Sequence, residues 1–355
     1  MKSDVTVALP SDLLLRGPEP ERVAVALLAP LSGIMGVAGP SIVNCAVLAA
    51  EDVSAATGRS IELVLIDAGR DAVTVAAEVD SLIRAGLVAG LSGTHPSDIR
   101  EAVDRVARGR VPYVFTPPHE YRRSHHASFY LGVGPLEQLR RPIAWLGRHR
   151  HVRRWALIGN DYVWPRQMHH AAATILSELK HEVVLDRLVP LGAVDTERLV
   201  AEAEHARADA LLVSLIGRDS IVFQREVDAV ASRPLVRLFT AFDENSLVAA
   251  GGDATGDVFA AMPSFVLQND DRHHRLMEHY AARFGLLAPV PGAYAEGTYE
   301  GMHVLATLCT SGMLAGGAET TNEGRTLLES VRQRSPQLAI ADGNELRVVE
   351  RLAEV

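Results

Sequence analysis

The sequence predicts an α/β fold in which two lobes each contain a doubly wound parallel sheet, joined by a multi-strand hinge. Two observations support this expectation. From residue 22 onward, short apolar runs alternate with amphipathic segments of helical period, which is the pattern of consecutive β–α–β units. The chain also has 355 residues, more than a single hydrophobic core usually organises, so two domains are expected.

The first part of the alternation runs from residue 23 to residue 115. Glycines mark the ends of its helices, because Gly58, Gly86 and Gly109 each follow a helical pattern. Residues 116–135 then break the rhythm with prolines and a His- and Arg-rich tract, which is typical of a functional loop or a domain boundary. The expected strands are 23–28, 61–66, 87–91 and 111–115, and the expected helices are 40–56, 73–85 and 98–108.

The alternation restarts after residue 135 with the same apolar strands and amphipathic helices. The expected strands are 155–158, 183–189, 210–215, 236–240 and 258–262, and the expected helices are 136–148, 167–180, 196–206 and 220–231. Three further amphipathic helices, at 270–284, 294–309 and 321–334, and a hairpin at 339–355 complete the chain.

The breaks near residues 135 and 265 predict that the chain crosses between the lobes more than once. We expect lobe 1 to hold residues 22–137 and 266–320, lobe 2 to hold residues 138–265 and 321–355, and residues 1–21 to form an N-terminal extension. Two lobes of this kind leave a cleft between them, and small-molecule sites favour such interfaces.

The composition argues against several classes of protein. A net charge of −9 excludes the basic groove that direct nucleic-acid binding needs. No stretch approaches the roughly 20 apolar residues of a membrane span, and residues 1–20 contain no secretory signal. We therefore expect a cytoplasmic protein, with a periplasmic or lipid-anchored one as the alternative if a leader has been removed.

Aromatic and hydroxyl side chains occur where the strands run into helices, which is where open parallel sheets bind ligands. Tyr162 and Trp164 follow the strand at 155–158. Their rings are expected either to line a ligand-binding surface or to pack onto the sheet and cover it. Ser97 is expected to be the N-cap of the next helix in lobe 1. The exposed N–H groups of that helix favour a carbonyl or anionic oxygen, although capping alone would also explain the serine.

The strand-end loops contain no catalytic constellation. They show no nucleophile beside a base, no nucleophile elbow, no phosphate-binding loop and no metal-ligand spacing of His or Cys. We therefore expect neither an enzyme nor a protein that needs a metal or a cofactor.

Together these loops resemble those of type I periplasmic-binding-protein folds. The stretch from Ile158 to Arg166, IGNDYVWPR, is similar to the IGSDYxYPR motif of amide sensors that control aliphatic amidase operons, a group related to urea and short-chain amide binding proteins. The first strand and turn at 25–33 and the segments 208–211 and 295–299 are also similar.

The resemblance implies a set of ligand-binding positions. The family's serine falls on Ser97, its neighbouring aromatic residue on His95, and the tyrosine that ends the fourth strand on Phe115. A family threonine is replaced by proline, with Thr116 alongside, and the two tyrosines of the second lobe fall on Tyr162 and Trp164. Among the lobe 2 loops, Asp243 and Glu244 could serve a ligand's ammonium or simply favour a helix N-terminus.

The leading functional prediction is a sensor of a small neutral amide or urea-like solute that closes by hinge motion. The resemblance implies an RNA-binding antitermination protein as its partner and leaves a homodimer open. The alternative is the solute-binding subunit of an ABC transporter for urea, short-chain amides or branched-chain amino acids. A DNA-binding repressor is not expected, because the residues before Val23 are too few and too acidic for a helix-turn-helix.

Overall fold

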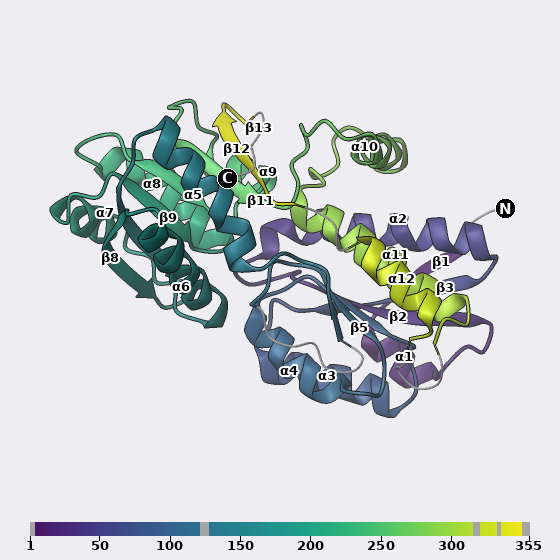
Figure 1. Cartoon of the computed structure of the whole chain (residues 1–355). Coiled ribbons are helices and arrows are strands. Elements are labelled where there is room, and N and C mark those ends of the chain that lie inside the picture. The colour runs from purple at the N-terminus through teal and green to yellow at the C-terminus, as the bar shows by residue number, and fades with distance from the viewer. Residues whose placement is uncertain (1–3, 121–127, 315–319, 332–334, 350–355) are drawn as a thin grey trace. The chain divides into compact units, whose positions relative to one another are not determined.

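The computed structural model describes residues 4–120, 128–314, 320–331 and 335–349. These residues fall into two compact units (Figure 1). Unit 1 comprises the described parts of Met1–Pro118, Arg122–Gly132 and Leu276–Gln333. Unit 2 comprises those of His119–Tyr121, Val133–Arg275 and Arg334–Val355. The chain therefore passes from one unit to the other several times, and each unit is built from segments distant in sequence.

Unit 1 is a six-stranded sheet in the order β1-β3-β2-β4-β5-β6, with every neighbouring pair parallel. Its strands are β1 (Val5–Ala8), β2 (Arg22–Ala29), β3 (Ser60–Asp67), β4 (Leu91–Gly93), β5 (Tyr113–Phe115) and β6 (Ser128–Tyr130). Its helices are α1 (Pro10–Arg16), the 3-10 turn η1 (Gly36–Ala38), α2 (Gly39–Thr57), α3 (Ala72–Arg84), α4 (Ser97–Ala107), α11 (Ala293–Thr310) and α12 (Asn322–Val331). Helix α10 (Asp271–Phe284) spans the boundary between the units.

Helices cover both faces of the unit 1 sheet, with α2 and α11 on one side and α3 and α4 on the other (Figure 1). The alternation of side chains along β2 explains this arrangement. Val25 and Leu27 pack in the core with α2 and α11, while Ala26 and Leu28 pack in the core with α3 and α4. A strand buried on both faces has to be apolar throughout, as this one is.

The segment expected as an N-terminal extension belongs to the unit 1 sheet instead. Val5 of β1 lies opposite Ile61 of β3 in a parallel register, and Leu13 of α1 is buried in the core with α3. The strand has only four residues, too few to show a period in the sequence. It was missed because its pairing partner lies more than fifty residues away, as the register shows.

Unit 2 is a seven-stranded sheet in the order β13-β12-β11-β10-β9-β7-β8. Its strands are β7 (Arg154–Asn160), β8 (Glu182–Val189), β9 (Ala210–Ser214), β10 (Val236–Phe239), β11 (Val258–Met262), β12 (Gln337–Asp342) and β13 (Glu345–Val348). Strands β7 to β11 are parallel, and β12 and β13 form the antiparallel edge. Its helices are α5 (Pro135–His149), α6 (Val163–Glu178), α7 (Thr196–His205), α8 (Gly217–Val230) and α9 (Glu244–Ala250).

The two sheets confirm the predicted α/β class, and the expected C-terminal hairpin corresponds to β12 and β13, with residues 350–355 outside the described part of the chain. The units differ from the expected lobes at several places, and residues 119–120 and 133–137 belong to unit 2 rather than to unit 1. Helix α12 belongs to unit 1, because Leu328 and Val331 pack against α11. Residues 266–275 belong to unit 2, where Glu244 accepts a hydrogen bond from the backbone N–H of Val266 (2.7 Å).

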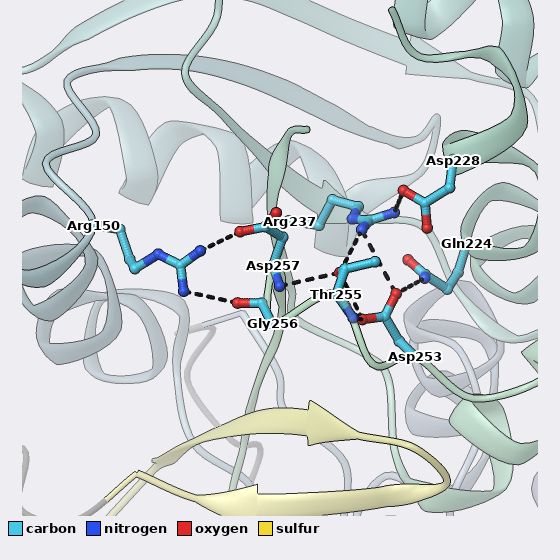
Figure 2. A network of polar contacts seen from close by, with 8 residues as sticks. All are labelled: Arg150, Gln224, Asp228, Arg237, Asp253, Thr255, Gly256 and Asp257. Carbon is cyan, nitrogen blue, oxygen red and sulfur yellow. Dashed lines mark hydrogen bonds and ion pairs between the residues drawn. The ribbon is translucent and has the colours of Figure 1, made fainter. Parts of the chain in front are cut away.

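A buried arginine network fixes the loop between α9 and β11 in unit 2 (Figure 2). Arg237 of β10 is only 1% exposed, and its guanidinium lies 2.7 Å from Asp228 and 3.6 Å from Asp253. Asp253 also accepts hydrogen bonds from the N–H and hydroxyl of Thr255 and from Gln224. Each oxygen of the buried Asp253 carboxylate is thereby hydrogen-bonded, as a charge removed from water requires.

Candidate functional site

At the carboxyl ends of the unit 1 strands, helix α4 begins with an uncapped N-terminus. Its N-cap is Pro96, which has no side-chain hydrogen bond, and Ser97 is the first helical residue rather than the N-cap expected from the sequence. The first intrahelical bond runs from Arg100 N–H to Pro96 O (3.2 Å), so the preceding N–H groups have no acceptor within the helix. The side chain of Ser97 makes no hydrogen bond to any residue that the structure describes.

Three threonine hydroxyls meet in the loops after β4 and β5 of the same unit. Thr94 Oγ1 lies 2.5 Å from Thr116 Oγ1 and 2.6 Å from Thr298 Oγ1. Thr116 also donates to Gly93 O (3.3 Å), and Thr298 donates to Tyr294 O (2.8 Å). These four contacts would need four protons, and the three hydroxyls supply only three, so one contact always lacks a proton. A hydroxyl can therefore turn towards a ligand oxygen and give up little of the hydrogen bonding within the cluster.

His95 and Phe115, both expected in the ligand site, lie in the core of unit 1 beneath these loops. The Nδ1–H of His95 donates to Pro96 O (3.1 Å), and its Nε2 accepts from the hydroxyl of Tyr113 (2.9 Å). Burial lowers the pKa of His95 to about 4, so the ring is neutral. The ring of Phe115 lies 5.2 Å from that of His95 and is fully buried.

The buried His95 should make the protein less stable in mild acid. Its folded pKa of about 4 lies below its ordinary 6.5, so between these values the unfolded chain takes up a proton that the folded chain excludes. The stabilisation is therefore complete above pH 6.5, and up to about 3 kcal/mol is lost as the pH falls towards 4. Urea unfolding of the wild type and His95→Gln at several pH values measures it. An equal pH slope in the two proteins would contradict the prediction.

At the strand ends of unit 2, Asn160 joins three segments of the chain. It ends β7, donates to the carboxylate of Asp219 (2.7 Å), and accepts from the N–H of Ile216 (2.9 Å). Asp219 also accepts from the N–H of Gly192 (2.8 Å). These bonds fix the loops that follow β7, β8 and β9 relative to one another, so this edge of the sheet is rigid before any ligand arrives.

Tyr162 and Trp164 lie at the start of α6, which begins earlier than the sequence suggested. Tyr162 is the half-buried N-cap, and Trp164 stands in the first turn with Pro165 after it. Trp164 is only 4% exposed, which agrees with the packing alternative. However, its indole Nε1–H has no acceptor among the described residues, and a buried donor without an acceptor calls for an explanation.

Asp243 and Glu244 stand at the N-terminus of α9. Asp243 caps this helix by accepting hydrogen bonds from Ser246 N–H (3.1 Å) and from its hydroxyl (3.0 Å), which is the structural alternative named from the sequence. One carboxylate oxygen of Glu244 accepts the hydrogen bond from Val266 N–H, while its Oε2 has no hydrogen-bond partner among the described residues. Burial, together with the neighbouring charge of Asp243, raises the pKa of Glu244 to about 7.

Sequence reasoning missed Thr94 and Thr298. Thr94 stands in a loop that the sequence marked as a strand end, so the local signal was present but not specific. Thr298 lies inside α11, and only the packing of that helix against β4 and β5 brings it to Thr94. The His- and Arg-rich tract at 121–127 lies outside the described residues.

Neither a metal centre nor a membrane helix emerges from the part of the chain that the structure describes. Within those residues, no group of three His, Cys, Asp or Glu side chains could hold a metal ion. None of the helices described there is both long and apolar enough to cross a bilayer.

A family model described as periplasmic binding protein matches residues 22–344, which is most of the chain. The match includes both sheets apart from β1 and β13. It confirms the resemblance to type I periplasmic-binding-protein folds. The narrower likeness to amide sensors stays a prediction.

Solved structures share the fold at low sequence identity. An amino acid ABC transporter substrate-binding protein from Pseudomonas fluorescens Pf-5 is 16% identical, with a TM-score of 0.76, and the match covers 93% of this chain and 95% of that one. A leucine binding protein from Thermotoga maritima is 15% identical (TM-score 0.76; 92% and 97% covered). A solute binding protein from R. palustris in complex with benzoate is 16% identical (TM-score 0.74; 94% and 97% covered). Identities this low show the fold alone.

Proposed function

The chain belongs to the periplasmic-binding-protein family, and on that premise we propose that it binds a small carboxylate-bearing solute for an ABC transporter. This places the alternative from the sequence ahead of the amide-sensing role. The similar structures named above are substrate-binding or solute-binding proteins, and the ligands in their names, leucine and benzoate, both carry a carboxylate. The proposal includes a place outside the cytoplasm, in contrast to the cytoplasmic location expected from the sequence.

The uncapped N-terminus of α4 is the observation that carries this proposal. Its first N–H groups have no intrahelical acceptor, and the hydroxyl of Ser97 stands among them without a partner in the described residues. The positive end of the helix dipole adds to these donors, so the position favours an oxygen with negative charge. A carboxylate fits better than a neutral amide, because a full charge gains more from the dipole.

The threonine cluster supports the same assignment. Thr94 and Thr116 directly follow β4 and β5, which are neighbours in the sheet, and Thr94 stands in the loop that leads into α4. Thr116 is 7% exposed and its bond to Gly93 O, at 3.3 Å, is the longest of the cluster. We therefore infer that the hydroxyl of Thr116 is the one that turns to the second carboxylate oxygen.

Ser97→Ala is expected to weaken binding of a carboxylate solute by about 1.5–3 kcal/mol, the usual contribution of a hydrogen bond to a charged group. The free energy of unfolding should change little, because the Ser97 hydroxyl bonds to no described residue. Calorimetry with leucine, benzoate, acetamide and urea measures this, with Ser81→Ala of α3, an exposed position, as the control. Tight binding of acetamide or urea with no response to either carboxylate would reject the proposal and favour the amide sensor.

A further inference from the structure

A surface cavity of about 380 Å³ lies at the end of the unit 2 sheet where the parallel strands begin. It is next to the last residues of α5 and α6 and the first residues of β7 and β8. Arg148 of α5 and Arg153 just before β7 contribute to its wall, together with His151 and His181. The amino ends of parallel strands form this edge, so the cavity is separated by the length of the strands from the carboxyl-end loops described above. Its volume is within the range of small-molecule pockets, at the lower end.

The cavity wall combines cationic side chains with no acidic one. Within the described residues, neither Arg148 nor Arg153 has a carboxylate partner, whereas neighbouring arginines do: Arg140 pairs with Glu178 and Arg154 pairs with Glu182. Both guanidinium groups stand beside one cavity. An arginine without a carboxylate offers its planar set of donors to an oxyanion.

His181 adds a ring nitrogen that has no partner in the described part of the chain. Its ring packs so closely over Gly147 that a Cβ at that glycine would lie 2.5 Å from His181 Cε1. The Nδ1 atom is buried and makes no hydrogen bond to a described residue. Burial lowers the pKa of His181, and the positive charge of Arg153 lowers it further.

The backbone at His151 holds an unfavourable conformation beside the cavity. Its φ of 55° is left-handed, as is the φ of 58° at Lys180, which directly precedes His181. Each residue follows the C-cap of a helix, α5 or α6, where glycine is the usual residue. These two turns lead into His151 and His181, which both line the cavity.

We propose that this cavity binds the phosphoryl group of a small organic phosphate, at a site distinct from the one for the transported solute. Two guanidinium groups and two imidazoles supply donors from several directions, which suits a tetrahedral dianion better than a planar carboxylate. The cavity is larger than a bare phosphate ion requires, so part of the organic group enters as well. The C-terminal ends of α5 and α6 carry partial negative charge, which disfavours an anion in the cavity. The positive charges of Arg148 and Arg153 outweigh this effect, because they are full rather than partial charges.

The test uses the full chain and measures the melting temperature and binding heat with inorganic phosphate, glucose 6-phosphate, AMP and, for ionic strength, sodium chloride. We expect an organic phosphate to bind more tightly than inorganic phosphate and sodium chloride to have no specific effect. Arg148→Gln/Arg153→Gln should weaken that binding by about tenfold or more. Arg198→Gln, at an exposed arginine of α7, is the matched control and should bind as the wild type does.

A second variant tests the geometry without removing a charge. Gly147→Ala should displace the His181 ring and weaken phosphate binding, while Ser97→Ala should leave it unchanged. In the wild type, the ring nitrogen signals of His181 should shift on titration with the phosphate. The proposal is overturned if none of the phosphates binds, or if Arg148→Gln/Arg153→Gln and Arg198→Gln bind them equally well with folding intact by circular dichroism.

Discussion

Arg237→Met is expected to lower the free energy of unfolding by about 3–5 kcal/mol, the usual loss when one partner of a buried ion pair is removed. The substitution keeps the apolar volume of the side chain but leaves the carboxylate of Asp253 without its cation. Asp253 is buried, so its charge cannot regain the lost interaction from water. Figure 2 shows that the same guanidinium also holds Asp228 and Thr255, so three contacts are lost together.

Urea unfolding followed by circular dichroism measures this loss. Arg198→Gln breaks an exposed pair with Glu202 and should change stability by no more than about 1 kcal/mol. Arg237→Met combined with Asp253→Asn should recover part of the loss, because the second change removes the unpaired charge. A loss below about 1 kcal/mol in Arg237→Met would show that water reaches the network, contrary to the burial of Arg237.

Most of the fold could be predicted because it depends on local patterns. Every expected strand from residue 23 to residue 262 overlaps a strand of one of the two sheets, although the strand expected at 87–91 shares only Leu91 with β4. Strands β1 and β6 were not expected, because β1 lies in the segment taken as an extension and β6 lies in the loop expected at 116–135. Helix α12 was placed in the wrong unit, since its position depends on contacts with α11 and not on its own sequence.

The candidate site was predicted less well, because its residues depend on side-chain direction and on contacts across the sheet. Ser97 could be located from the strand–helix boundary, but its role as first helical residue depends on Pro96 taking the N-cap. Thr298 lies in the segment 295–299 that resembles the family, but its contact with Thr94 depends on the packing of α11 and could not be predicted from that segment. Asp243 is different, because a local pattern was enough. The sequence indicated a helix N-terminus as one of its two roles, and the carboxylate caps α9.

Phe115→Ala is expected to lower the free energy of unfolding by about 3–5 kcal/mol through the cavity it leaves, and to change solute affinity little in the folded protein. Phe115 is fully buried, although the sequence placed it in the ligand site. Its ring packs against His95 and Tyr130, with the guanidinium of Arg100 5.7 Å above it. Because side chains alternate along a strand, Phe115 points into the core with α3 and α4, away from Val114, which packs with α2 and α11.

Thr116→Val is the matched variant, because it changes the next residue by replacing one hydroxyl with a methyl group of similar size. It should weaken carboxylate binding by about 1.5–3 kcal/mol if Thr116 contacts the solute. Its stability should fall less than that of Phe115→Ala, since the contacts of the Thr116 hydroxyl with Thr94 and Gly93 are replaced without a cavity. Calorimetry and urea unfolding of both variants separate the two effects. If Phe115→Ala lost affinity with unchanged stability, Phe115 would be a ligand contact and the core assignment would be wrong.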